Sequence, residues 1–238
     1  MGPLEVYEKL LSCYGKQNWW PVTEQGAIAP TYKARKRLSE NQKFEIALGA
    51  ILAQNTAWKN AEKAIINLNK AGVLDCGKIA NAKQAGLAQL IRPSGYYNQK
   101  AKKLILFAKY LQKQYGCKIS KMFEKEIPEL RKELLDLHGV GEETADSIIL
   151  YSAGKPIFVV DAYTRRLGGR IFYRPMNSYV DTQEFFQKNL PKDLALFQEF
   201  HALIVAHSKR FCGKKPCCEE CFLNNTCQFF LSGKNEKD

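Results

Sequence analysis

The sequence of 238 residues lacks the two features that would direct it into or across a membrane. No segment approaches the run of about 18 apolar residues that a transmembrane helix needs. Residues 1–14 carry acidic side chains and no apolar block of the kind found in a cleavable signal peptide. Apolar residues make up 45% of the chain and charged residues 25%, which excludes disorder throughout. We therefore expect a folded cytoplasmic protein of one large domain or two modest ones.

Acidic residues are scarce relative to basic ones. The 36 Lys and Arg residues outnumber the 24 Asp and Glu residues, so the formal net charge is +12. Residues 92–122 hold eight basic residues and no acidic one. Such an excess favours a polyanionic partner, most commonly nucleic acid, although a basic protein with solvated helix faces is the alternative. A second basic group consists of Arg165, Arg166, Arg170 and Arg174.

Strand patterns are also scarce, because few segments alternate apolar and polar residues. Most apolar residues recur at helical spacing instead. We found neither an internal repeat nor a low-complexity linker. The sequence therefore predicts an all-α protein. The segments that predict helices are residues 41–53, 57–68, 99–115, 144–151 and 186–205, the last interrupted at Pro191, with a further helix opening at Pro128.

A glycine-rich turn joins two of the predicted helices. Gly139 and Gly141 lie in the segment Leu-His-Gly-Val-Gly, residues 137–141. Glycines at this spacing allow a tight turn with positive φ and let backbone N–H groups approach a ligand unhindered. The next helix begins at once, so its unpaired N–H groups suit a phosphate oxygen. An ordinary turn between helices with a glycine cap is the alternative.

Four motifs in one order resemble those of the helix-hairpin-helix (HhH-GPD) DNA glycosylase superfamily. The turn belongs to a longer match at residues 137–145, and Gly-Lys-Pro at residues 154–156 precedes Asp161. Upstream, Leu-Ala-Gln-Asn-Thr at residues 52–56 resembles the segment whose glutamine enters the duplex. Cysteines near the C-terminus complete the pattern of the endonuclease III subgroup.

The resemblance implies a two-domain all-α fold. One domain is a six-helix bundle over residues 37–153 that carries the hairpin. The other joins residues 1–36 to residues 154–238 and carries a loop with a [4Fe–4S] cluster. The DNA site is expected between the two domains. The expected partner is double-stranded DNA with a damaged base, bound by a monomer.

The resemblance assigns the central chemistry to one carboxylate. Asp161 takes the position of the essential aspartate, which stabilises the positive charge on the sugar as the base leaves and orients the attacking water. Its alternative role, the N-cap of the following helix, is compatible with catalysis. Bifunctional members also carry a hairpin lysine that attacks the sugar and forms a Schiff base. That position holds Glu143, so we expect a monofunctional glycosylase.

Aromatic residues near the N-terminus indicate the base that is removed. Trp19 and Trp20, followed by Phe44, resemble the 3-methyladenine DNA glycosylase III branch, which also has Glu at the position of Glu143. The resemblance implies a pocket of these four residues around a cationic alkylated purine of the 3-methyladenine or 7-methylguanine type. Such a base leaves without prior protonation, which agrees with Ala50 where adenine-mismatch glycosylases need a glutamate. Ordinary core packing of both tryptophans is the alternative.

Two other functions fit the same motifs. A glycosylase for uracil, hypoxanthine or mismatched thymine is the alternative within the enzyme class. A lesion-binding protein without catalysis is the alternative outside it. Pure binding does not need the Asp161 carboxylate, which favours the enzyme.

Several residues of the bundle are expected to reach the duplex. A flipped base leaves a hole in the stack, and the resemblance assigns Gln54 to it. The segment at residues 94–98 resembles the loop that probes the opposite strand, so Tyr96 or Tyr97 is expected to wedge between bases. Lys100, Lys102 and Lys103 are expected to hold phosphates, together with residues of the hairpin. The hairpin residues are Gly139, Gly141 and Thr144.

Five of the eight cysteines lie between residues 212 and 227. Without a secretory signal, such a group predicts a metal site in preference to disulfides. Intervals of five, two and five residues suit a [4Fe–4S] cluster, with a four-cysteine zinc site as the alternative. The predicted ligands are Cys212, Cys218, Cys221 and Cys227.

The cysteine pattern departs from the resemblance in two ways. The first interval is one residue shorter than in the endonuclease III subgroup, and the known 3-methyladenine branch member lacks the cluster. Cys217 also rivals Cys218 as the second ligand, but Cys218 preserves the CxxC step to Cys221. The expected role of the cluster is structural.

Overall fold

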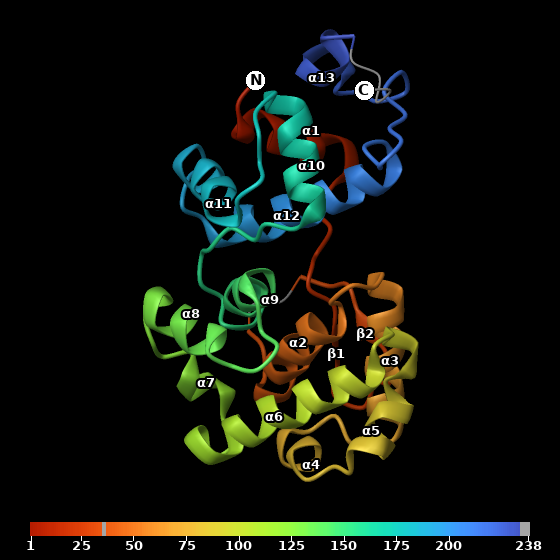
Figure 1. Cartoon of the computed structure of the whole chain (residues 1–238), viewed down its shortest axis with the longest axis vertical. Coiled ribbons are helices and arrows are strands. Elements are labelled where there is room, and N and C mark those ends of the chain that lie inside the picture. The colour runs from red at the N-terminus through yellow and green to blue at the C-terminus, as the bar shows by residue number, and fades with distance from the viewer. Residues whose placement is uncertain (35–36, 234–238) are drawn as a thin grey trace. The chain divides into compact units, whose positions relative to one another are not determined.

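The structure is a computed structural model that describes residues 1–34 and 37–233, and it is built almost entirely of helices (Figure 1). The all-α prediction is confirmed. The chain divides into two compact units. The bundle unit comprises residues 18–155, and the terminal unit joins residues 1–17 to residues 156–238. Residues 35–36 and 234–238 lie outside the described part.

The bundle unit holds most of the predicted helices. Observed and predicted bounds agree within about two residues for most of the longer ones, as expected for helix ends. A short antiparallel pair, β1 (Val22–Thr23) and β2 (Pro30–Thr31), precedes them. The helices are α2 (Glu40–Leu52), α3 (Trp58–Lys70), α4 (Cys76–Ala80), α5 (Gln84–Leu90), α6 (Tyr97–Tyr115), α7 (Ile119–Met122), α8 (Ile127–Leu135) and α9 (Glu142–Ser147).

Helix α2 runs through the middle of the bundle unit (Figure 1). The Ser39 hydroxyl caps it by accepting a hydrogen bond from the Gln42 N–H at 3.2 Å, while the Gln42 side chain accepts one from the Ser39 N–H at 3.1 Å. Residues 44–52 are buried without interruption, because α3, α6, α7, α9 and β1 pack around the helix. This burial on all sides makes α2 the core helix of the unit.

Helix α9 continues into one turn of π-helix, Ile148–Ser152, whose residues are all buried. This turn packs against α2, and the Ser152 hydroxyl donates a hydrogen bond to the Lys43 carbonyl at 2.7 Å. The prediction of a helix over residues 144–151 is therefore right about helical structure. The change of helical geometry carries no signal in the apolar spacing.

Contacts between phenylalanine rings stabilise the core of the terminal unit. Phe158 stacks on Phe186 with ring centroids 4.5 Å apart, and Phe197 and Phe200 meet the same ring edge-on. Such contacts add to the stabilisation from burial alone. The helices of this unit are α1 (Pro3–Tyr14), α10 (Ala162–Phe172), α11 (Tyr179–Lys188), α12 (Leu194–Arg210) and α13 (Gln228–Leu231).

Residues 18–34 differ from expectation, since they group with the bundle unit and not with the terminal unit. The buried Glu45 carboxylate accepts hydrogen bonds from the Thr23 N–H at 3.0 Å and hydroxyl at 2.8 Å. The Trp20 ring lies directly over Gly49 of α2. These contacts tie the segment to α2, and their partners are too distant in sequence to be read from local pattern.

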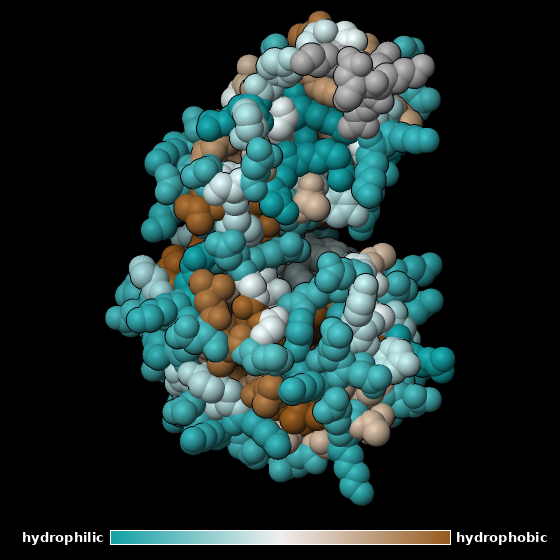
Figure 2. All heavy atoms as spheres, in the orientation of Figure 1, coloured by the Kyte–Doolittle hydropathy of each residue, from teal (hydrophilic) through white to brown (hydrophobic). Residues whose placement is uncertain are grey.

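Hydrophilic side chains dominate the face drawn in Figure 2. Within the described part, no helix is both long enough and apolar enough to cross a membrane. Six of the eight basic residues in the acid-free stretch are exposed, namely Arg92, Lys102, Lys109, Lys113, Lys118 and Lys121. The other two, Lys100 and Lys103, bind parts of the protein itself.

Candidate functional site

The glycine turn connects α8 to α9 as a helical hairpin. Gly139 has φ +80°, and a Cβ at this position would lie 2.5 Å from the Lys103 side chain. Both its backbone conformation and its neighbour therefore require glycine. Gly141 precedes α9 in extended backbone, and a Cβ there would meet nothing within 4 Å. Its backbone is thus open to an approaching ligand.

A salt bridge between α8 and α9 stabilises the hairpin. The Arg131 side chain of α8 donates a hydrogen bond through Nε to the Asp146 carboxylate of α9 at 2.8 Å. The Asp146 side chain is fully buried, so the pair is shielded from water and its removal on one side would leave an uncompensated charge. Glu143, in the first turn of α9, is exposed.

Gln54 lies against the hairpin. Its Nε2 group donates hydrogen bonds to the Gly139 carbonyl and to the buried Thr144 hydroxyl, both at 2.9 Å. Its Oε1 atom accepts one from Lys103 Nζ at 2.6 Å. The structure therefore brings three predicted DNA-contacting residues together, and Lys103, which the sequence predicted to hold a phosphate, is bound to Gln54.

The Tyr96 loop presents an exposed ring on unusual backbone. Tyr96 has φ +44°, follows Gly95 with φ +68°, and is 64% exposed. A non-glycine residue in the left-handed region costs about 1–3 kcal/mol and persists where surrounding structure imposes it. Tyr97 is half-buried at the start of α6. Of the two tyrosines, Tyr96 is the one available as a wedge.

Lys100 corrects one sequence prediction. Its side chain is 2% exposed, and its ammonium donates hydrogen bonds to the Leu52 carbonyl at 2.8 Å and the Ser94 carbonyl at 2.7 Å. Burial, reinforced by the nearby Lys103 charge, lowers the pKa of Lys100 to about 8. An ammonium held inside the protein in this way does not reach a DNA phosphate.

Aromatic rings gather near the start of the bundle unit. Trp58 contacts both Trp19 and Trp20 with ring centroids 4.9 Å apart, and Trp20 also meets Tyr151 at 5.4 Å. A Cβ on Gly49 would lie 3.1 Å from the Trp20 ring, which explains a glycine in the middle of α2. Both predicted tryptophans belong to this aromatic cluster. Trp58 was missed because it lies far from them in sequence.

Phe44 is the second correction. Its ring is 3% exposed and stacks on Phe107 at 6.3 Å, within the core of the bundle unit. A ring enclosed in this way has no open face for a flipped base. Burial on every side of α2 is the physical reason.

Asp161 begins helix α10 as its N-cap. Its Oδ1 atom accepts a hydrogen bond from the Thr164 N–H at 2.6 Å, and Oδ2 lies 3.7 Å from His201 Nε2 of α12. Burial by itself raises the pKa of the carboxyl, but His201 and Thr164 outweigh it, so the pKa lies below its ordinary value. The result is a charged carboxylate that is only 8% exposed.

All four arginines of the basic group that follows Asp161 line one open hollow. Arg170 is also buried, and its guanidinium donates hydrogen bonds to the Gly213 carbonyl at 2.7 Å and the Lys214 carbonyl at 3.2 Å. Arg170 therefore anchors the cysteine loop, while the hollow offers positive charge to solvent.

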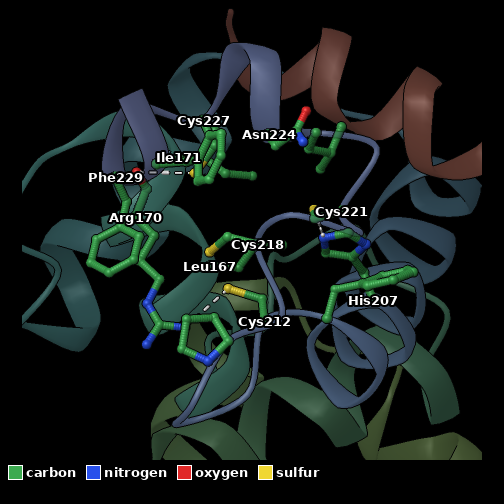
Figure 3. A pocket seen from close by; sticks show the side chains of 14 residues that line it. Leu167, Arg170, Ile171, His207, Cys212, Cys218, Cys221, Asn224, Cys227 and Phe229 are labelled. Atoms are coloured by element: carbon green, nitrogen blue, oxygen red, sulfur yellow. Dashed lines mark hydrogen bonds between the residues drawn. The ribbon is translucent and has the colours of Figure 1, made fainter. Parts of the chain in front are cut away.

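The four predicted cysteine ligands line one pocket, shown in Figure 3. Most of the remaining lining is apolar. The Cys212 sulfur accepts a hydrogen bond from Arg170 Nη1 at 3.3 Å, and the Cys221 sulfur lies 3.5 Å from His207 Nε2. Burial raises the pKa of the Cys221 thiol to about 11. Cys217 is exposed and does not line the pocket.

His201 and His207 received no role from the sequence, yet each contacts a candidate functional side chain. Their partners, Asp161 and Cys221, are 40 and 14 residues away. Neither contact leaves a local pattern, because both depend on where α12 packs. The described bundle unit thus contains Gln54, Tyr96, the hairpin and the aromatic cluster, and the terminal unit contains Asp161 and the cysteines.

Comparisons with known proteins match nearly the whole chain. The family "HhH-GPD superfamily base excision DNA repair protein" matches residues 48–192. A candidate DNA repair glycosylase of Methanocaldococcus jannaschii is 43% identical over 225 residues, which cover 94% of each chain. Endonuclease III of Thermotoga maritima is 32% identical over 207 residues, which cover 84% of this chain and 92% of its own.

A solved structure shows the same fold with related sequence. The 3-methyladenine DNA glycosylase of H. pylori, in complex with 1,N6-ethenoadenine, superposes with a TM-score of 0.72 at 27% identity. The match covers 88% of this chain and 98% of that one. The matched family segment, residues 48–192, includes Gln54, the hairpin and Asp161 but ends before the cysteines.

Proposed function

Since the chain belongs to the HhH-GPD superfamily of base excision DNA repair proteins, we propose that it is a monofunctional DNA glycosylase for alkylated purines. In this proposal, Asp161 and a water molecule hydrolyse the bond between the sugar and a flipped base. The observation that carries the proposal is a buried, ionised Asp161 in a chain whose hairpin has Glu143 in place of a nucleophilic lysine.

The Asp161 environment suits stabilisation of positive charge. As the base departs, the sugar acquires oxocarbenium character, and a fixed carboxylate in a poorly solvated site stabilises it strongly. The N-cap bond to Thr164 fixes the orientation of one oxygen. The other oxygen, beside His201, is the candidate to orient the attacking water.

Glu143 supports hydrolysis by water. A carboxylate cannot form an imine with the sugar, so the covalent route of the bifunctional enzymes is closed at this position. Glu143 lies exposed in the first turn of α9.

The aromatic cluster supports a flat, cationic substrate. Trp19, Trp20 and Trp58 offer electron-rich faces, which attract a cationic alkylated purine and stack on its ring. Such a base already carries the charge that other bases gain by protonation, so the absence of a glutamate at Ala50 is no obstacle. The name of the H. pylori glycosylase, 3-methyladenine DNA glycosylase, and its bound ethenoadenine point to the same class.

The cysteine pocket supports a [4Fe–4S] cluster. All four thiols line one mostly apolar pocket, and the exposed Cys217 lies outside it, which favours Cys218 as the second ligand. Four thiols at intervals of five, two and five residues suit a [4Fe–4S] cluster, with a four-cysteine zinc site as the alternative. When bound, the cluster would cross-link the loop that follows α12, from Cys212 to Cys227.

Product analysis tests the proposed reaction. The chain is incubated with duplexes that carry 3-methyladenine, 7-methylguanine, uracil, hypoxanthine or a thymine mismatch, and released bases are identified with and without alkali. We expect free alkylpurine and strand breaks only after alkali. Release of a deaminated or mismatched base instead would establish the alternative substrate class. Binding without release would establish a lesion-binding protein.

Borohydride trapping tests the nucleophile. A Schiff-base intermediate would be reduced to a stable protein–DNA adduct, whereas hydrolysis by water leaves none. We expect no adduct with this chain, and an adduct with Glu143→Lys would show that the position is competent. An adduct with the unmodified chain would overturn the monofunctional assignment.

A further inference from the structure

Lys100 occupies a place that no catalytic or phosphate-binding role explains. It lies in the first turn of α6, with its side chain 2% exposed. Its hydrogen bonds end on two main-chain carbonyls, of Leu52 at 2.8 Å and of Ser94 at 2.7 Å. A buried ammonium held by neutral carbonyls is costly compared with an apolar side chain of similar length, and it persists only where its bonds are needed.

The two carbonyls belong to the two loops expected to enter DNA. Leu52 is the last residue of α2, two positions before Gln54. Ser94 ends the short helical turn Arg92–Ser94, two positions before Tyr96. Terminal carbonyls of helices lack partners within their own helix. One ammonium therefore satisfies a free carbonyl from each loop and joins the loops through a single atom.

Both loops have strained backbone within three residues of the joined carbonyls. Asn55 has φ +52° and Tyr96 has φ +44°, each a non-glycine residue in the left-handed region. Such conformations require external support. Lys103, one helical turn after Lys100, adds support on one side by binding Gln54 at 2.6 Å. The start of α6 is thus the common anchor for both loops.

We propose that Lys100 is a positioning residue that fixes the Gln54 loop and the Tyr96 loop relative to each other, so that both enter a damaged duplex together. The inference rests on the proposed function, which gives the two loops a duplex to enter. Lys100 itself touches neither the base nor the phosphates. Its loss is expected to weaken recognition of the distorted site more than general attraction to DNA.

The test compares Lys100→Met with Lys109→Met. Both variants remove one ammonium from α6, but Lys109 is exposed to solvent. The probes are a duplex with a tetrahydrofuran abasic analogue and the same duplex undamaged, and the measurement is the ratio of their dissociation constants. We expect Lys100→Met to reduce this selectivity about tenfold, and Lys109→Met to change it less than about twofold. Equal loss for both duplexes in Lys100→Met would overturn the positioning role.

A double-mutant cycle separates positioning from a general loss of structure. If Lys100 acts through the loops, Lys100→Met adds less than about twofold to the selectivity loss of a Gln54→Ala/Tyr96→Ala protein. An additive tenfold loss would contradict the proposal. Should Lys100→Met fail to fold, Lys100→Gln supplies the same comparison, because its shorter amide reaches at most one carbonyl. An unmodified chain without preference for the abasic analogue would instead refute the proposed function.

Discussion

Asp161 and Lys100 are both buried charged residues, but the surroundings of Asp161 favour its charged form and those of Lys100 disfavour it. Asp161 accepts a hydrogen bond from a helix N-terminus and lies beside His201, so its pKa is lowered and the charged form is favoured. Lys100 contacts two neutral carbonyls and has Lys103 nearby, so its pKa is lowered to about 8 and the charged form is disfavoured.

The difference agrees with the two proposed roles, a charge that takes part in the reaction at Asp161 and a charge that fixes geometry at Lys100. A carboxylate that stabilises a developing cation must be ionised before the reaction begins. An ammonium that joins two loops needs only its N–H groups, and a neutral amine retains two of them. The direction of each pKa shift is therefore consistent with the role proposed for the group.

Asp161→Asn is the substitution that changes this comparison most. Asparagine retains the N-cap bond to Thr164 but carries no charge. We expect base release to slow by about 10³-fold, because transition-state stabilisation is lost, while binding to an abasic duplex is retained. Single-turnover release of 3-methyladenine measures the first effect and a binding titration the second. Equal activity of variant and parent would refute the catalytic role.

Gly139→Ala tests the structure around Lys103. Alanine would have to adopt φ +80°, and its methyl group would collide with the aliphatic part of Lys103. The free energy of unfolding is therefore expected to fall by about 2–3 kcal/mol. Gly141→Ala is the matched control, because its Cβ meets nothing within 4 Å and its φ is negative. We expect it to cost about 0.5 kcal/mol in stability yet to weaken DNA binding. Urea unfolding separates the two, and equal destabilisation would contradict the assignment.

The pH dependence of stability tests the Lys100 environment. The unfolded chain keeps the Lys100 proton up to its ordinary pKa of 10.5, whereas the folded protein releases it at about 8. Between these values the unfolded state binds more protons, so stability rises with pH. Relative to Lys100→Met, the parent is expected to gain about 2 kcal/mol between pH 8 and 10. Urea unfolding at several pH values measures the gain, and a constant difference would show an unshifted lysine.

His201→Leu has the smallest expected effect, and it tests the other half of the comparison. Without the imidazole, burial is opposed only by Thr164, so the pKa of Asp161 should rise and the acid limb of the activity profile should move to higher pH. The stability that Asp161 contributes is complete above its ordinary pKa of 3.8 and is lost as pH falls through its lower folded value. This loss should begin at higher pH in the variant. Unchanged profiles would show that His201 does not tune Asp161.

The fold could be predicted from sequence where local signals agree. The long helices α2, α3 and α6 follow apolar spacing, and α10 follows the cap at Asp161. The place of residues 18–34 could not be predicted, since it depends on Glu45 and Gly49 meeting a distant segment. Periodicity reports which face of a helix is apolar, but not which segment covers it.

The candidate site divides in the same way. The resemblance predicted roles for Asp161, Gln54 and the four cysteines, because those residues stand at fixed positions in a recognisable order. The contacts of Asp161 with His201 and of Gln54 with Lys103 were not predicted, since each depends on packing between helices. Lys100 was predicted to bind a phosphate from its charge alone, because nothing in its sequence neighbourhood reveals that it is buried.

The π-helical turn at Ile148–Ser152 constrains the length of this part of the chain. Such a turn holds one residue more than α-helical geometry would, and each residue of an α-helix rotates the following side chains by about 100°. Deleting one residue here is expected to restore regular geometry and to change the position on the helix of Tyr151, whose ring contacts Trp20. The number of residues in this turn therefore determines which side chain lies beside Trp20 in the aromatic cluster. An insertion or deletion at this point would change the cluster in the same way as a substitution.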